Sequence, residues 1–118
     1  MKSHKDLLVW QKSVDMVIRI YSESKCWPKE ELYGLTSQIR RAAVSVPSNI
    51  AEGAGRSGRK EFAHFLSIAM GSLAEVETQL IIAMRLGFLK NFSDLDDSLQ
   101  EIRRMIFGLN KSLELRLD

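Results

Sequence analysis

A sustained seven-residue repeat of apolar side chains in the second half of the chain constrains the fold more than any other feature. Steps of four and three residues separate Phe62, Leu66, Ala69, Leu73, Val76, Leu80 and Ala83. This spacing puts these side chains on one face of a helix and is typical of antiparallel bundles and coiled coils. We therefore predict a helix over residues 59–86, about 40 Å long at roughly 1.5 Å per residue.

Helical periodicity also dominates the rest of the chain, and no segment alternates as a strand does. It predicts helices over residues 5–25, 31–54 and 94–115. Pro28, the glycine-rich segment 53–58 and Gly87 separate the segments. With 45% apolar and 27% charged residues in 118, the chain suits one globular domain. We predict an all-α, antiparallel up-and-down four-helix bundle over residues 1–118.

Single residues predict where two of the helices begin, where one ends and where one is kinked. Ser57 and Ser93 are the predicted N-caps of the third and fourth helices, and Gly87 with Phe88 predicts a glycine C-cap for the third helix. Pro47 lies inside the second helix, where it lacks a donor and crowds the preceding turn, so we expect a kink there.

The first two helices carry more apolar surface than one bundle core needs. In the first helix, the predicted core stripe is Leu7, Trp10, Val14, Val17 and Tyr21, with a second stripe of Val9, Met16 and Ile20 beside it. In the second helix, the core stripe is Leu32, Leu35, Ile39, Ala42, Val46 and Ile50. Small and charged residues follow the opposite side of that helix. We therefore predict an oligomer interface made of Val9, Met16, Ile20, Ser37, Arg41, Val44, Ser48, Ala51 and Glu52.

Catalytic, metal and cofactor motifs are weak. Glu61 and His64 have a spacing seen in di-iron bundles, but such a site needs a second Glu-x-x-His motif, and the other histidine is His4. Cys26 is the single cysteine and has no nearby histidine in the sequence. The glycine-rich segment follows a helix and lacks the Gly-Lys-Ser/Thr ending of a phosphate loop. We expect no enzyme activity, no cofactor, no metal and no small-molecule substrate.

Basic residues gather in the first half of the chain. Residues 1–60 hold 11 Lys and Arg against 6 Asp and Glu, whereas the net charge of the chain is +2. A basic surface can contact phosphates without base specificity, so the candidates for nucleic-acid binding are Arg40, Arg41, Arg56, Arg59 and Lys60. For the last three, a solvated basic loop is the favoured alternative.

Localisation is expected to be cytoplasmic, with no membrane partner. The N-terminus lacks the apolar core and cleavage site of a signal peptide, and no uninterrupted apolar run reaches the ~20 residues that cross a bilayer.

Residues 33–53 resemble the signature of the four-helix bundle family, also called the 23S ribosomal RNA intervening-sequence protein family. The matching run reads YGLTSQIRRAAVSVPSNIAEG. Flanking matches are LVWQ (8–11), GSLAEVETQL (71–80) and LGFL (86–89). The resemblance implies a left-handed up-and-down four-helix bundle assembled as a homopentamer, in a bacterial family without known catalytic residues. A related group, the accessory variability determinant of diversity-generating retroelements, implies a basic pentamer that works with nucleic acid.

These observations predict a non-enzymatic, homo-oligomeric bundle that binds RNA or DNA through a basic surface, with a pentamer as the form that the resemblance implies. The alternative is a structural adaptor that recruits a protein partner and has no nucleic-acid role. A salt series distinguishes them, because phosphate contacts weaken steeply as salt rises.

Overall fold

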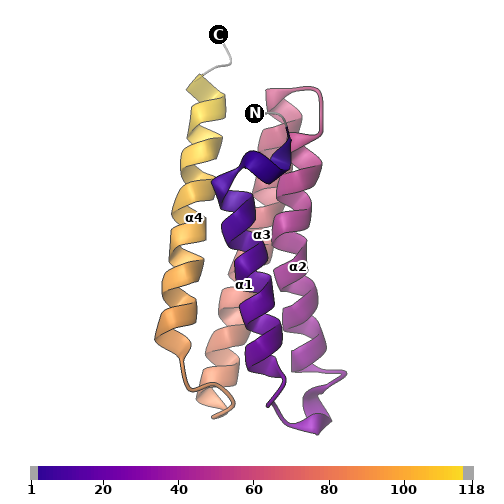
Figure 1. Ribbon diagram of the computed structural model, residues 1–118, viewed down its shortest axis with the longest axis vertical. Helices are drawn as coiled ribbons and strands as arrows, with labels where there is room; N and C mark the ends of the chain where they lie inside the picture. Colours follow the sequence, from indigo (N-terminus) through magenta and orange to yellow (C-terminus); the bar gives the residue numbers. More distant parts are fainter. Residues whose placement is uncertain (1–2, 116–118) are drawn as a thin grey trace.

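Four long helices form an up-and-down bundle in the computed structural model, which describes residues 3–115 (Figure 1). They are α1 (Leu8–Ser24), α2 (Leu35–Ala54), α3 (Arg59–Arg85) and α4 (Phe92–Leu115). Two short 3-10 helices, η1 (His4–Asp6) and η2 (Lys29–Glu31), precede α1 and α2. No strand occurs within residues 3–115. The all-α four-helix bundle predicted from the sequence is confirmed.

Each helix runs antiparallel to the next, and the principal extents of the bundle are 50 × 23 × 20 Å. The closest association is between α2 and α3, while α1 contacts α2 and α4, and α4 contacts α3. The α2–α3 turn therefore lies at one end of the bundle. The α1–α2 connection lies at the other end (Figure 1).

The core confirms the stripes predicted for the third helix and most of those for the second. Leu66, Leu73 and Leu80 of α3 are fully buried, as are Ile39 and Ile50 of α2. Leu32 is an exception, because it lies in the connection before α2 and is 47% exposed. Pro47 is buried, and α2 continues through it as one helix.

Leu7, Trp10 and Val17 of the predicted α1 core stripe are partly buried and pack against the core, but the assignment of the second stripe was wrong. Val9, Met16 and Ile20, assigned to an oligomer interface, are buried in the core of the single chain, at 4%, 0% and 1% exposure. Tyr21, assigned to the core, is 41% exposed. Because α1 is apolar on more than one side, its own periodicity cannot identify the side that faces the other helices.

The two predicted serine N-caps were also wrong. Ser57 lies in the turn, and α3 begins after Gly58 without a side-chain cap. Ser93 lies inside α4, which begins at Phe92. The glycine C-cap is confirmed: Gly87 has φ 82°, and the N–H groups of Gly87 and Phe88 donate to the carbonyls of Met84 and Ala83. That pair of bonds is a Schellman motif.

A close approach of α2 to α3 fixes their relative position. A Cβ on Gly53 would lie 2.8 Å from Cβ of Phe65 and 3.0 Å from Cδ1 of Phe62. Further along, the hydroxyls of Ser45 and Ser72 share a hydrogen bond of 2.8 Å. The Asn49 amide donates to the carbonyl and the hydroxyl of Ser45. Glycine and serine side chains thus let the two backbones pack without a wide apolar layer between them.

Polar contacts tie the remaining helices together. Lys12 of α1 pairs with Glu101 of α4 at 3.0 Å. Arg103 of α4 pairs with Glu77 of α3 at 3.0 Å. The hydrogen bond from Arg103 is the main cause that lowers the pKa of Glu77, and a hydrogen bond from Gln100 adds to it. The Glu77 carboxylate is therefore stabilised in its charged form at the α3–α4 contact.

Arg40 joins the end of α1 to α2. Its Nε donates to the hydroxyl of Ser24 at 2.9 Å, and its guanidinium lies over the Tyr21 ring, 4.8 Å from the centroid. A cation near a helix C-terminus also interacts favourably with the negative end of the helix dipole. Arg40 therefore links the C-terminal end of α1 to α2.

By length and composition alone, α3 is apolar enough to cross a membrane, with a mean hydropathy of 1.3 in its most apolar window. Its seven-residue stripe supplies much of this hydropathy, and that stripe packs inside the bundle. Core helices of bundles share this property.

We predict that Gly53→Ala lowers the free energy of unfolding by about 1–3 kcal/mol, because the added Cβ overpacks the α2–α3 contact. Gly108→Ala is the matched control, since a Cβ there meets nothing within 4 Å inside α4. Alanine at position 108 should raise stability by about 0.5–1 kcal/mol. Urea denaturation measures both changes. Equal stabilisation by the two substitutions would contradict the close approach.

We also predict that Arg40→Gln destabilises the fold by about 1 kcal/mol, because it removes charged hydrogen bonds at the end of α1. Arg41→Gln, one residue along, should change stability by less than about 0.5 kcal/mol, because Arg41 is exposed and forms no ion pair in the described chain. Thermal unfolding followed by circular dichroism measures the difference. Equal melting temperatures for the two variants would show that Arg40 has no structural role.

Candidate assembly and nucleic-acid interface

The side of α2 that points away from the bundle keeps six of the predicted interface residues together. We call it the outer face of α2, and it consists of Ser37, Arg41, Val44, Ser48, Ala51 and Glu52. All six are exposed or half-buried. Because α2 is pinned by α1 on one side and α3 on the other, these residues are presented on one continuous strip of surface.

Small side chains dominate the outer face. Ser37, Ser48 and Ala51 leave the α2 backbone accessible to close approach, and Val44 between them is 40% exposed. An exposed apolar side chain among small residues is a surface against which another helix can pack closely. The strip therefore has the shape and chemistry of a helix-packing surface without a partner in the single chain.

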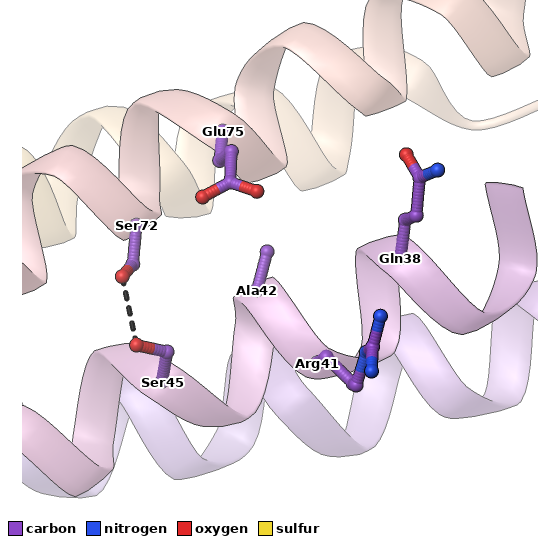
Figure 2. A pocket seen from close by; sticks show the side chains of 6 residues that line it. All are labelled: Gln38, Arg41, Ala42, Ser45, Ser72 and Glu75. Carbon is purple, nitrogen blue, oxygen red and sulfur yellow. Dashed lines mark hydrogen bonds between the residues drawn. The ribbon is translucent and has the colours of Figure 1, made fainter.

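A groove between α2 and α3 borders this strip (Figure 2). Its volume is about 260 Å³, and Ser72 and Glu75 of α3 line it together with Gln38, Arg41, Ala42 and Ser45 of α2. The Ser45–Ser72 hydrogen bond closes one end of the groove, and Arg41 and Glu75 approach it from the two helices. Neither Arg41 nor Glu75 forms an ion pair within the described residues. Both charges are therefore available to complementary groups of another molecule.

A second hollow lies at the far end of the outer face, next to the α2–α3 turn. It is lined by Ser48, Ala51, Glu52, Gly55 and Arg56. Glu52 pairs with Arg56 at 3.0 Å, one helical turn apart. Arg56 also lies over the Phe65 ring, 5.1 Å from its centroid. The guanidinium of Arg56 is thus held at the edge of the turn with part of its charge compensated.

The five basic candidates do not form one patch. Arg40 lies apart from the other four, because its half-buried guanidinium is bonded to Ser24 and to the Tyr21 carbonyl near the α1–α2 connection. Arg41 lies about 20 Å along α2 from Ala54, where the helix ends before Arg56, at roughly 1.5 Å per residue. Arg56, Arg59 and Lys60 are exposed and share the α2–α3 turn and the first turn of α3. The turn is therefore the most basic part of this group.

Arg59 and Lys60 stand where a helix disfavours positive charge. The positive end of the helix dipole is at the N-terminus of α3, so two cations there raise the local potential. The amides of that turn lack a side-chain cap. Glu61 in the same turn offsets part of this charge, while the cations, the amides without a side-chain cap and the dipole favour an anion at this end of the bundle.

The described residues offer few candidates for a catalytic or metal site. No group of three or more His, Cys, Asp or Glu side chains within that part of the chain could hold a metal ion. Cys26 is exposed, and His64 contacts Phe65 edge to face with ring centroids 5.4 Å apart. Glu61 and His64 are exposed on the surface of α3.

Glu75 and Gln38 were not predicted as parts of the groove. Glu75 lies one step away from the heptad position Val76, and Gln38 lies beside Ile39. Neither position shows by itself that the residue lines a groove, because the groove forms only where α2 and α3 pack together. The apolar surface around Phe107 of α4, which is 60% exposed, was not predicted either. Phe107 follows Ile106, which is buried in the core, and one residue along a helix turns the side chain about 100° away from that contact.

Comparisons with known proteins agree with this architecture. The family model described as 23S rRNA-intervening sequence protein matches residues 5–108. A similar solved structure is the 1.70 Å crystal structure of a protein of unknown function from the S23 ribosomal protein family of Bacteroides thetaiotaomicron VPI-5482. It is 23% identical, has a TM-score of 0.79, and the match covers 88% of this chain and 99% of that one. No curated protein matches the chain. The chain belongs to the 23S rRNA-intervening sequence protein family.

Proposed function

We propose that this protein is a non-enzymatic module that self-assembles through the outer face of α2 and binds the phosphates of RNA or DNA at its α2–α3 turn. The observation that carries the proposal is the outer face itself. Its small side chains, its exposed Val44 and its nearby unpaired charges of both signs, Arg41 and Glu75, suit packing against a second copy.

The outer face of α2 would be the centre of the interface and not the whole of it. A protein interface of standard size buries about 800 Å² on each partner. An α2 helix of 20 residues is about 30 Å long and about 10 Å wide, so its outer face covers about 300 Å², and the bordering groove and neighbouring helices would supply the rest. Apolar burial contributes about 25 cal/mol per Å² before the costs of association. The family resemblance suggests a pentameric ring as the form of the assembly.

A cyclic ring explains how a weakly charged chain could bind a polyanion. In such a ring every copy has the same orientation, so all α2–α3 turns gather on one side. Five copies of a chain with net charge +2 would carry +10. Arg56, Arg59 and Lys60 of each copy would then contact phosphates together, and multivalency would strengthen contacts that are weak singly.

Val44→Asp should break the assembly, because it places an unpaired charge in an apolar contact. Ile18→Asp is the matched control, since Ile18 is 63% exposed on α1, away from the outer face of α2. Sedimentation velocity at micromolar concentration should show an oligomer for the wild type and for Ile18→Asp, and a 13.4 kDa species for Val44→Asp. An unchanged oligomer in Val44→Asp would place the interface elsewhere.

The double variant Arg59→Glu/Lys60→Glu should weaken binding to structured RNA and lower the slope of log K against log salt by about 1 for each phosphate that the protein no longer neutralises. Arg19→Glu/Arg104→Glu changes the net charge equally, at two exposed positions without ion pairs in the described chain. Gel shifts over a salt series measure the slopes. Equal slopes for the two double variants, or no binding by the wild type at low salt, would remove the nucleic-acid role.

A protein adaptor is the second candidate, and the groove between α3 and α4 favours it. This groove has a volume of about 420 Å³ and is lined by Leu66, Ser67, Met70, Gly71, Ala74, Ile106, Phe107 and Asn110. An apolar groove beside an exposed aromatic ring can accept an apolar side chain of a partner. If the protein is an adaptor, it should have a stable protein partner, and Phe107→Ala should abolish binding of that partner. Any retention of RNA should then show no dependence on salt.

A further inference from the structure

A small hollow at the opposite end of the bundle has the chemistry of an anion site. It lies where α1 ends and α2 begins, and its volume is about 210 Å³. Its lining includes Ser24, Lys25, Trp27, Lys29, Thr36 and Arg40. The remaining lining residues are Pro28 and Leu32, so the wall contains three cations and no carboxylate.

Thr36 supplies an unused hydroxyl to this hollow. It is only 3% exposed, it lines the hollow, and its hydroxyl forms no hydrogen bond in the described chain. The hydroxyl oxygen is not one of the fully buried, unpartnered polar atoms, so it keeps some accessible surface and is open to a ligand in the hollow. Because Thr36 stands in the first turn of α2, its hydroxyl is close to the positive end of a 20-residue helix.

Two residues that line the hollow, Thr36 and Trp27, carry further donors without an acceptor. The Leu35 amide donates to Oε1 of Glu31 at 3.2 Å, whereas the amides of Thr36 and Ser37 donate to no backbone carbonyl in the described chain. Trp27 in the wall is 6% exposed, and its buried indole N–H also lacks an acceptor. An indole N–H can only donate. The unsatisfied groups here are therefore donors that lack an acceptor.

Positive charge completes the arrangement. Lys25 and Lys29 are exposed at the rim. Arg40 uses Nε for Ser24 and Nη2, at 3.5 Å, for the Tyr21 carbonyl, which leaves other guanidinium donors free. Glu31, the nearest acidic side chain in sequence to Thr36, is occupied by the Leu35 amide. The Glu31 carboxylate keeps its negative charge at the α2 N-terminus, but the lining of the hollow itself holds three cations, which favour an anion over a cation there.

From these donors and charges we propose that the hollow binds a phosphate-sized oxyanion, either as inorganic phosphate or as the terminal phosphate of a larger molecule. Thr36 holds its oxygens through its hydroxyl and its amide, and Lys25, Lys29 and Arg40 neutralise its charge. This site is separate from the α2–α3 turn, and it requires neither assembly nor nucleic-acid binding there.

The test is a titration of the ¹⁵N-labelled full chain with inorganic phosphate at constant ionic strength, followed by the two indole N–H signals. The Trp27 signal should move saturably, with a Kd of about 1 mM or tighter. Trp10, in the first turns of α1 at the other end of the bundle, is the internal control and should stay in place. Movement of both signals in parallel, or none at Trp27, overturns the site.

Variants assign the binding to the hollow. Thr36→Val and Lys29→Gln should each weaken phosphate binding about tenfold. The matched controls are Thr78→Val and Lys90→Gln, both exposed and outside the hollow, which should leave the Kd unchanged. Lys29 is on the surface, so its variant keeps the test valid if Thr36→Val does not fold. Wild-type affinity in Lys29→Gln and in folded Thr36→Val overturns the proposal.

A second titration separates the two sources of the anion. A short RNA with a 5′-phosphate and the same RNA with a 5′-hydroxyl are compared by the Trp27 signal. A shift with the phosphorylated RNA alone shows a terminal phosphate as ligand, and a shift with inorganic phosphate alone shows the free ion. Either result supports the site, and equal shifts with both RNAs contradict recognition of a phosphate-sized group. Disruption of this site would leave the salt slope of Arg59→Glu/Lys60→Glu unaffected, so the two proposals fail independently.

Discussion

The contact between α2 and α3 is the constraint on which the surfaces of this protein depend. Gly53 lets the helices meet near the turn, and the hydrogen bond between Ser45 and Ser72 joins them further along. A larger residue at either place would force the helices apart and turn α2 about its own axis. The outer face of α2 and the groove beside it exist because this contact fixes which side of α2 remains outside.

The basic residues of the single chain lie at several separate places. Arg40 holds α1 against α2, Arg56 is paired with Glu52, and Arg59 and Lys60 are free at the α2–α3 turn. A total of +2 is too small for strong binding of a polyanion by one copy. In the proposed function, assembly and nucleic-acid binding are therefore linked, because only repetition of the turn would bring enough positive charge to one surface.

The sequence predicted the features that leave a periodic pattern of apolar residues, and it missed those that depend on contacts between distant segments. The seven-residue stripe of α3 predicted the position of that helix and its buried residues well, because the repeat continues over the whole helix; Ile68 and Ile82, which lie outside the stripe, are exposed. In α1, apolar residues on several sides hid the fact that Met16 and Ile20 face the core. The role of Arg40 depends on Ser24, 16 residues away, and the hollow at Thr36 depends on three segments meeting. Neither leaves a periodic trace in the sequence.

Self-association of the native chain is the central claim, and sedimentation equilibrium of the purified protein at micromolar concentration measures it most directly. We expect a single oligomeric species with a mass that is an integral multiple of 13.4 kDa, with five as the multiple favoured by the family resemblance. A homogeneous species of 13.4 kDa across that concentration range would contradict self-association.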